Sequence, residues 1–153
     1  MTCSTIMHAE PITVTENVTV GETVKLLAEK RFRSIPVVNG DGKMLGQFGV
    51  SNILKLAIPA SASPEGGMSS ANFMNDSIED LQRRLADDWN KSVGDYCDND
   101  TQTLAPEDSL TRTIMCIASG NQDNIPVVDP DSGRLVGIIS YWDVLDHLLS
   151  EIK

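Results

Sequence analysis

The chain contains the same pattern of residues twice. Ile35–Val38, with the sequence Ile-Pro-Val-Val, returns as Ile125–Val128, and this offset of 90 residues holds from position 13 to position 41. One residue inserted near Ser132 then increases the offset to 91, which continues to the pair Leu54 and Leu145. A repeat defines the unit of folding, and an open array needs three or more units to bury its core. We therefore expect two units of about 55 residues to pack on each other, with their interface as the first candidate for a functional site.

Each copy has the pattern of a β-α-β-β-α unit. Thr19 and Ser109 are residues of the type that caps helices, and each precedes apolar residues at helical spacing. A β-branched run, a turn rich in Gly and Asp, and a second apolar run follow each helix, which predicts a β-hairpin. A further helix should close each copy, from Ser51 to about Ile58 and from Tyr141 to about Glu151. The pattern predicts the α+β fold class, with each hairpin sheet covered by two helices.

The two copies are separated by a stretch that has no counterpart elsewhere in the chain. We divide the chain into a first repeat (1–58), a linker with one helix (59–92) and a second repeat (93–153). The segment 59–67 has the composition of a flexible linker. A helix then opens at Ser77, with Ser77 or Asp76 as its cap, and its apolar stripe consists of Ile78, Leu81, Leu85 and Trp89. This helix either packs against the repeats or binds a partner chain.

Composition and spacing exclude several classes of function. The net charge of −10 argues against nucleic-acid binding, which needs clustered Lys and Arg, but a local pocket can still accept a small anion. No apolar run reaches the roughly 18 residues of a membrane span, and the N-terminus lacks a secretion-signal pattern, so the prediction is a cytoplasmic protein. Cys3, Cys97 and Cys116 lack metal-binding spacing, and His8 and His147 have no evident ligand or catalytic partner in the sequence. We predict no metal site and no enzymatic activity.

The ordered set of features, present twice, resembles the cystathionine β-synthase (CBS) domain family. The set is the strand Ile-Pro-Val-Val, a turn Gly, a second Gly four residues on, and Ser-x-x-Asp at the start of a helix. The resemblance covers roughly 115 of the 153 residues. It implies a stand-alone tandem pair, the Bateman module, whose copies pack sheet to sheet about a pseudo-twofold axis. It also implies a regulatory role, homodimers, and two inter-repeat clefts for AMP, ADP, ATP or S-adenosylmethionine, with the participation of Mg²⁺ left open.

The second copy matches the ligand-binding pattern of this family more fully than the first. Ser140 and Asp143 stand where the family has a hydroxyl and an acid. A carboxylate in the first helical turn can accept both ribose hydroxyls, and a hydroxyl beside backbone N–H groups can bind a phosphate. Both residues are also ordinary helix caps, and Trp142 either lines the pocket or fills the core. The resemblance implies a site made of Thr103, Leu104, Asn124, Ile125, Pro126, Ser140, Trp142 and Asp143.

The first copy departs from this pattern. Gly49 stands in place of the serine and Asn52 in place of the acid, and an amide is a weaker acceptor than a carboxylate. We interpret Ser51 as the cap of the following helix. Arg31 and Arg33 precede the first Ile-Pro-Val-Val, where they either face a phosphate bound chiefly by the second copy or lie at a solvated helix end. A second site in this copy would use Thr13, Ile35, Pro36, Ser51 and Asn52.

Two hypotheses about function remain open on the sequence. The leading one is a sensor that binds an adenine-containing ligand mainly through the second repeat, and that changes its shape or its affinity for a regulated protein. A ligand shifts such an equilibrium only by its differential affinity for the two states. The alternative is a ligand-free scaffold that dimerises and presents an interaction surface. The acidity of the chain, the imperfect first site and the helix with Trp89 favour this alternative.

Overall fold

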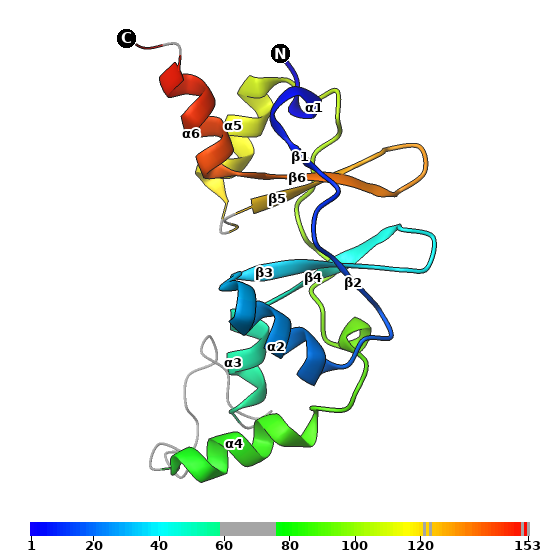
Figure 1. Ribbon diagram of the computed structural model, residues 1–153, viewed down its shortest axis with the longest axis vertical. Helices are drawn as coiled ribbons and strands as arrows, with labels where there is room; N and C mark the ends of the chain where they lie inside the picture. Colours follow the sequence, from blue (N-terminus) through cyan, green and yellow to red (C-terminus); the bar gives the residue numbers. More distant parts are fainter. Residues whose placement is uncertain (59–75, 121, 123, 151, 153) are drawn as a thin grey trace.

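Two three-stranded sheets face each other at the centre of the molecule, and helices cover their outer sides (Figure 1). Residues 1–58, 76–120, 122, 124–150 and 152 are described by the computed structural model. The strands are β1 (His8–Ala9), β2 (Val14–Thr15), β3 (Ser34–Val38), β4 (Met44–Gly49), β5 (Asn124–Val128) and β6 (Leu135–Ser140). The helices are α1 (Cys3–Ile6), α2 (Val20–Lys30), α3 (Val50–Leu56), α4 (Ile78–Asp87), the short 3-10 helix η2 (Val93–Asp95), α5 (Leu110–Ser119) and α6 (Tyr141–Ser150).

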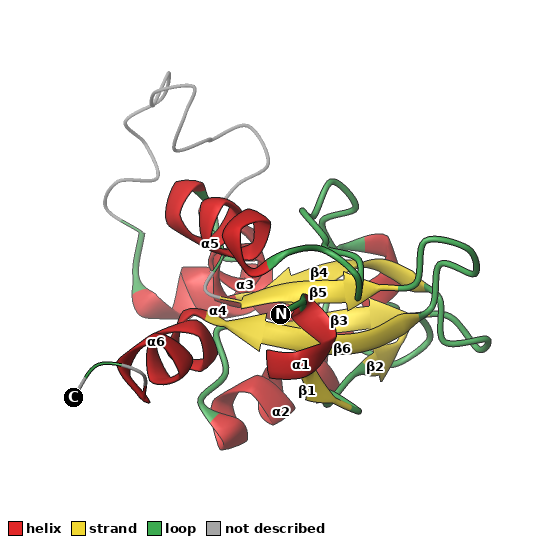
Figure 2. Cartoon of the chain, turned by 90° about the horizontal axis from the view of Figure 1, so that it is seen from above, coloured by secondary structure: helices red, strands yellow, loops and turns green. Residues whose placement is uncertain are grey.

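The predicted α+β architecture of two packed repeats is confirmed. The first lobe contains the sheet β2-β3-β4 with helices α2, α3 and α4, and the second lobe contains the sheet β1-β6-β5 with helices α1, α5 and α6. Seen from above, the strands of the two sheets lie over one another (Figure 2). The predicted helix caps are also confirmed, because Thr19 accepts a hydrogen bond from the Glu22 N–H and Ser109 accepts one from the Arg112 N–H, both at 3.1 Å.

Each lobe includes a short segment of chain that belongs to the other repeat in sequence. Strand β1, near the N-terminus, pairs with β6 of the second lobe, with His8 opposite Ile138. In the first lobe the corresponding edge position is held by Asp98, whose N–H and C=O bond to Gln47 at 2.8 and 3.0 Å. This exchange of segments was not part of the sequence-based division of the chain. The repeats therefore fold as one unit, since neither lobe is complete without chain from the other.

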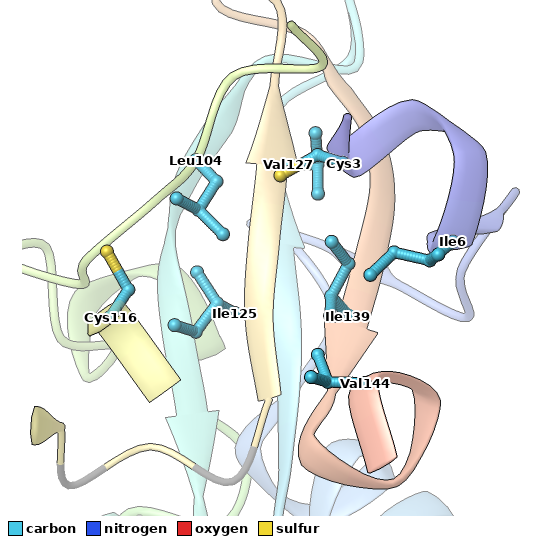
Figure 3. Packing of buried hydrophobic residues seen from close by; sticks show 8 residues of the cluster. All are labelled: Cys3, Ile6, Leu104, Cys116, Ile125, Val127, Ile139 and Val144. Atoms are coloured by element: carbon cyan, nitrogen blue, oxygen red, sulfur yellow. The ribbon is translucent and has the colours of Figure 1, made fainter. Parts of the chain in front are cut away.

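The two lobes have separate aliphatic cores, and both cores include exchanged residues. In the second lobe Cys3 and Ile6 lie against the sheet beside Val127 and Ile139 (Figure 3). The core of this lobe consists of Cys3, Ile6, Leu104, Cys116, Ile125, Val127, Ile139 and Val144. The core of the first lobe consists of Val14, Val20, Leu27, Ile35, Val37, Phe48 and the exchanged Val93. Burial of these apolar side chains is the main stabilising contribution to each lobe.

The two hairpin turns join the lobes at one end of the sheets. The N–H of Met44 donates to the carbonyl of Gly133, and the N–H of Leu135 donates to the carbonyl of Gly42, both at 3.0 Å. Gly42 and Gly133 have φ values of 83° and 76°, in the left-handed region where glycine has no Cβ penalty. The turns that the sequence predicted therefore reverse each strand and also form a backbone contact between the two copies.

Helix α4 packs on the first lobe, which favours the packing interpretation of the unrepeated stretch. The predicted cap is confirmed, since Ser77 accepts a hydrogen bond from the N–H of the third helical residue, at 3.2 Å. The Gly21 N–H donates to the Trp89 carbonyl at 2.8 Å, and a methyl group on Gly21 would lie 2.2 Å from the Trp89 indole nitrogen. Of the predicted stripe, Leu81, Leu85 and Trp89 are half-buried, whereas Ile78 is 62% exposed. The predicted flexible segment 59–67 lies outside the described residues.

The segment after α4 carries a carboxylate whose charge should stabilise the fold. Asp88 accepts hydrogen bonds of 2.9 Å from the Lys91 ammonium and from the Tyr96 hydroxyl. The bond from Lys91, followed by that from Tyr96, lowers the pKa of Asp88 although partial burial opposes this. Because the pKa of the folded state is depressed, the stabilisation is present above the unfolded pKa of about 4 and is lost as the pH falls through the folded value.

We expect Asp88→Asn to lower the melting temperature at pH 7, because the amide loses the charge that Lys91 and Tyr96 stabilise. The difference from wild type should shrink as the pH falls below about 4 and through the lowered pKa of the folded Asp88 carboxyl. Thermal unfolding measured across this range checks the expectation. Asp87→Asn, at the exposed neighbouring position, is the matched control. If the melting temperature of Asp88→Asn stayed below that of wild type by the same amount at every pH, the charge of Asp88 would contribute nothing to stability.

Candidate functional site

A cavity of about 590 Å³ opens between the lobes where β4 passes into α3. This volume lies within the range of about 300–1,000 Å³ that is typical of small-molecule sites. Most of its wall comes from the first repeat, and one side comes from the chain that leads into the second repeat. The polar side chains of the wall are Arg33, Ser34, Gln47, Ser51, Asn52, Lys55, Asp98, Asp100, Thr101 and Gln122.

The start of α3 gives the cavity its shape. Gly49 ends β4, and its N–H donates to the side-chain oxygen of Asn52 at 2.9 Å, so that Asn52 caps the helix. A Cβ on Gly49 would lie 2.5 Å from the carbonyl oxygen of Arg33, and glycine therefore allows β4 and the chain before β3 to approach closely. The prediction that Ser51 caps this helix is wrong. Ser51 is the second residue of α3 and lies exposed on the cavity wall.

A chain of amides connects the two lobes at this cavity. The Gln47 side chain is 7% exposed, donates to the Asn124 side-chain oxygen at 3.1 Å and accepts from the Gln122 amide at 3.2 Å. The second repeat has Ile138 at the position equivalent to Gln47, so the two inter-repeat clefts are not alike. Sequence reasoning missed Gln47, although a polar residue inside an otherwise apolar strand was the available signal.

The cavity carries charges of both signs. Arg33 and Lys55 supply cations, while Asp98 and Asp100 supply carboxylates. Such a wall suits a ligand that has both an anionic group and several hydrogen-bond donors. Of the two arginines predicted to face a ligand, only Arg33 lines this cavity. Arg31 lines a smaller, mainly apolar cavity of about 350 Å³ between α2 and α3.

In the second repeat, Ser140 and Asp143 form a capping pair at the start of α6. One Asp143 carboxylate oxygen accepts the Ser140 N–H at 2.8 Å and the Ser140 hydroxyl at 3.1 Å. The other carboxylate oxygen lies 2.7 Å from the Nε2 atom of His8, which comes from β1. The ring of His8 is 71% exposed and the Asp143 side chain 15% exposed. Sequence reasoning missed this partner of His8, because the two residues are 135 positions apart.

The other predicted residues of the second copy lie mostly in the core. The side chains of Leu104, Ile125 and Pro126 are buried, and the N–H and C=O of Leu104 both bond to strand β5, at 3.0 and 2.7 Å. Thr103 is exposed. Asn124 is half-buried, and its side-chain oxygen accepts a hydrogen bond from the Gln47 amide. The interpretation of Trp142 as a core residue is wrong, since its side chain is 60% exposed and packs on the neighbouring Tyr141 ring.

The first-copy positions show a similar division. Ile35 and Pro36 are buried in strand β3, whereas Thr13 is half-buried just before β2. Of the residues proposed for a second site, only Ser51 and Asn52 line the cavity. Within the described ranges there is no group of three or more His, Cys, Asp or Glu side chains that could hold a metal ion. No helix in the same ranges is long and apolar enough to cross a membrane.

Comparison with known proteins places the chain in a family. Residues 3–58 and 93–150 each match the CBS domain, and the chain therefore belongs to the CBS domain family as a tandem pair. It is 25% identical over 151 residues to the uncharacterized protein MJ1426 of Methanocaldococcus jannaschii, covering 92% of this chain and 87% of the relative. It is 29% identical over 129 residues to the chloroplastic CBS domain-containing protein CBSX1 of Arabidopsis thaliana, covering 83% of this chain and 54% of the relative.

Solved structures show the same fold. The crystal structure of CBSX2 in complex with AMP superposes on this chain with a TM-score of 0.73 at 20% identity, covering 99% of this chain and 98% of the other. A CBS domain-containing protein from Bacillus anthracis superposes with a TM-score of 0.75 at 17% identity, covering 99% and 95% of the two chains. The chain thus has the fold of a tandem CBS pair.

Proposed function

We propose that the protein is a sensor that binds an adenine nucleotide between its two repeats and passes this occupancy to a partner protein. The observation that carries the proposal is the cavity of about 590 Å³, which combines the cations Arg33 and Lys55 with the polar side chain of Asn52. A phosphate group is neutralised by such cations, and a bidentate arginine contact adds geometric specificity. The AMP found in the structure of CBSX2 supports AMP as the first ligand to test.

The polar wall matches the groups of a nucleoside monophosphate. Ribose hydroxyls both donate and accept hydrogen bonds, so they suit the side-chain amide of Asn52 and the hydroxyls of Ser51 and Thr101. The carboxylates of Asp98 and Asp100 suit donor groups such as the exocyclic amine of adenine. The second repeat, which the sequence favoured, offers the stronger ribose acceptor in Asp143. We therefore assign ligand binding to both clefts, with the first one open in this conformation.

The scaffold alternative is favoured by a specific observation on the surface. Large apolar side chains are exposed along α6 and on α3, and exposed apolar surface is a common feature of interaction sites. These exposed residues are Leu54, Tyr141, Trp142, Leu145, Leu148 and Leu149. A second copy of the chain is the partner we propose for this surface, since two copies would bury equivalent helices. Homodimerisation is compatible with the sensor, and it would be the whole function only if no ligand bound.

Thermal unfolding against a ligand panel tests the proposal. The panel contains AMP, ADP, ATP and S-adenosylmethionine, each with and without Mg²⁺. A ligand at about a hundred times its dissociation constant should stabilise the protein by about 2.7 kcal/mol, which raises the melting temperature by roughly 5–10 °C. Ser51→Trp places a large side chain on the cavity wall from an exposed position, and should remove most of this rise. If the protein is a dimer whose melting temperature changes with none of these ligands, the sensor hypothesis is refuted and the scaffold hypothesis remains.

A further inference from the structure

His8 of β1 and Asp143 of α6 are in contact in the second lobe, 2.7 Å apart, where the resemblance to the family implies the second cleft. In the first lobe the equivalent positions are Asp98 and Asn52, which both line the open cavity of about 590 Å³. The equivalence follows from the pairing of strands, because β1 and the segment at Asp98 occupy the same edge of their respective sheets. In the first lobe the pair therefore consists of an acid on the exchanged segment, Asp98, and an amide on the helix, Asn52. In the second lobe it consists of a histidine, His8, and an acid, Asp143.

This difference has a direct consequence for ligand binding. A carboxylate receives a ribose diol through both of its oxygens, one for each hydroxyl. In the second cleft one Asp143 oxygen is bound by Ser140, and the other lies 2.7 Å from the His8 ring nitrogen. A hydrogen bond to a carboxylate is of the stronger kind, and the carboxylate here is largely screened from water. The acid that would recognise ribose is therefore already engaged from both sides.

We propose that His8 is a latch on the second cleft. It occupies the Asp143 oxygen that a ribose hydroxyl needs, so a nucleotide enters this cleft only after the imidazole has moved aside. The inference rests on the proposed function, since it concerns the same ligand at the second of the two clefts. It makes a residue of the exchanged N-terminal segment the determinant of which cleft is filled first. The 71% exposure of the His8 side chain leaves it room to move.

The experiment isolates the second cleft and measures AMP binding by calorimetry. Ser51→Trp fills the first cleft, and His8→Ala is then added to this background. Removal of the latch should tighten AMP binding to the remaining site by about tenfold, as expected for the release of one charge-assisted hydrogen bond. Addition of Asp143→Asn should cancel the gain. His147→Ala, which replaces the other histidine of the chain, is the matched control and should change nothing.

A second measurement needs no variant. The ring-nitrogen resonance of His8 in the wild-type protein should shift as AMP saturates the second cleft, while that of His147 should stay in place. AMP binding to wild type, combined with unchanged or weaker affinity after His8→Ala in the filled background, would overturn the latch alone. Failure of AMP to bind wild type or any variant would refute the proposed function and the latch together.

Discussion

Replacement of Gly46 by alanine is expected to destabilise the protein by about 3 kcal/mol, the upper end for an added methyl group in a packed interior. A Cβ at this position would lie 2.2 Å from the Asp98 carbonyl oxygen and 2.8 Å from its carbon. That oxygen accepts the Gln47 N–H at 3.0 Å, so it cannot retreat without breaking the edge of the sheet. The substitution should therefore weaken the backbone contact between Gln47 and Asp98, which joins the two repeats.

Gly137→Ala is the matched control for this prediction, because Gly137 is the pseudo-symmetric counterpart of Gly46. Its added Cβ would lie 2.5 Å from the Met7 sulfur and 3.0 Å from the His8 carbonyl oxygen. Methionine is unbranched and adapts to new neighbours, so the cost should be only about 1 kcal/mol. Chemical denaturation measures both values. Equal costs at the two positions would contradict the tight backbone contact at Asp98.

Arg33→Ala is expected to weaken AMP binding by roughly 10- to 100-fold, the loss that follows from removing a hydrogen bond to a charged group worth about 1.5–3 kcal/mol. Arg33 lines the open cavity, and its guanidinium would bind the phosphate. Adenosine has no phosphate, so its affinity should change by less than about twofold, within the scatter of a distant surface substitution. Calorimetric titration of both ligands separates a lost phosphate contact from a general loss of the site.

Arg31→Ala provides the control, because Arg31 is an exposed arginine two positions away that lines another cavity. It should leave the affinity for AMP close to that of wild type. If the two variants weakened AMP equally, the effect would be the general field of positive charge rather than a contact in the cleft. If Arg33→Ala weakened adenosine as much as AMP, Arg33 would act on the shape of the site and not on the phosphate.

The local elements of the fold were predictable because their signals are local. The caps at Thr19, Ser109 and Ser77 are set by residues within one helical turn, and the hairpins by β-branched runs around glycine turns. The constant offset between the copies then gave the pseudo-symmetry, since equal patterns fold into equal units. The fold class and the pairing of the repeats followed from these features, whereas the packing of the linker helix was one of two alternatives that the sequence left open.

The exchange of segments was not predictable from the same signals. Strand β1 has only two residues, His8 and Ala9, and it pairs with a strand that lies about 130 positions further along the chain. No periodicity marks so short a strand, and its position depends on the tertiary packing of Cys3 and Ile6. The contact between His8 and Asp143 depends on this exchange, so it could not be predicted from the sequence.

The residues of the candidate site were likewise predictable only in part. Asn52 was predicted for a site in the first copy and lines the cavity there, whereas Arg33 was predicted for a phosphate held chiefly by the second copy but lines the same first-copy cavity. Gln47 was missed because its role is to link two lobes that are distant in sequence. For Trp142 the sequence left a pocket role and a core role open, and its side chain is 60% exposed on a face of α6 that is not covered within one chain. Burial against a second copy, as proposed for this face, is not encoded in any single-chain pattern.

A crystal structure of the protein grown with saturating AMP would show which cleft the nucleotide occupies. We expect AMP in the first cleft, with its phosphate at Arg33 and its ribose beside Asn52, and with His8 displaced from Asp143 wherever the second cleft is also filled. AMP bound only in the second cleft, with the His8–Asp143 contact intact, would contradict both the order of filling and the latch. AMP bound outside both clefts, or no AMP at all, would contradict the proposal that this CBS pair senses an adenine nucleotide between its repeats.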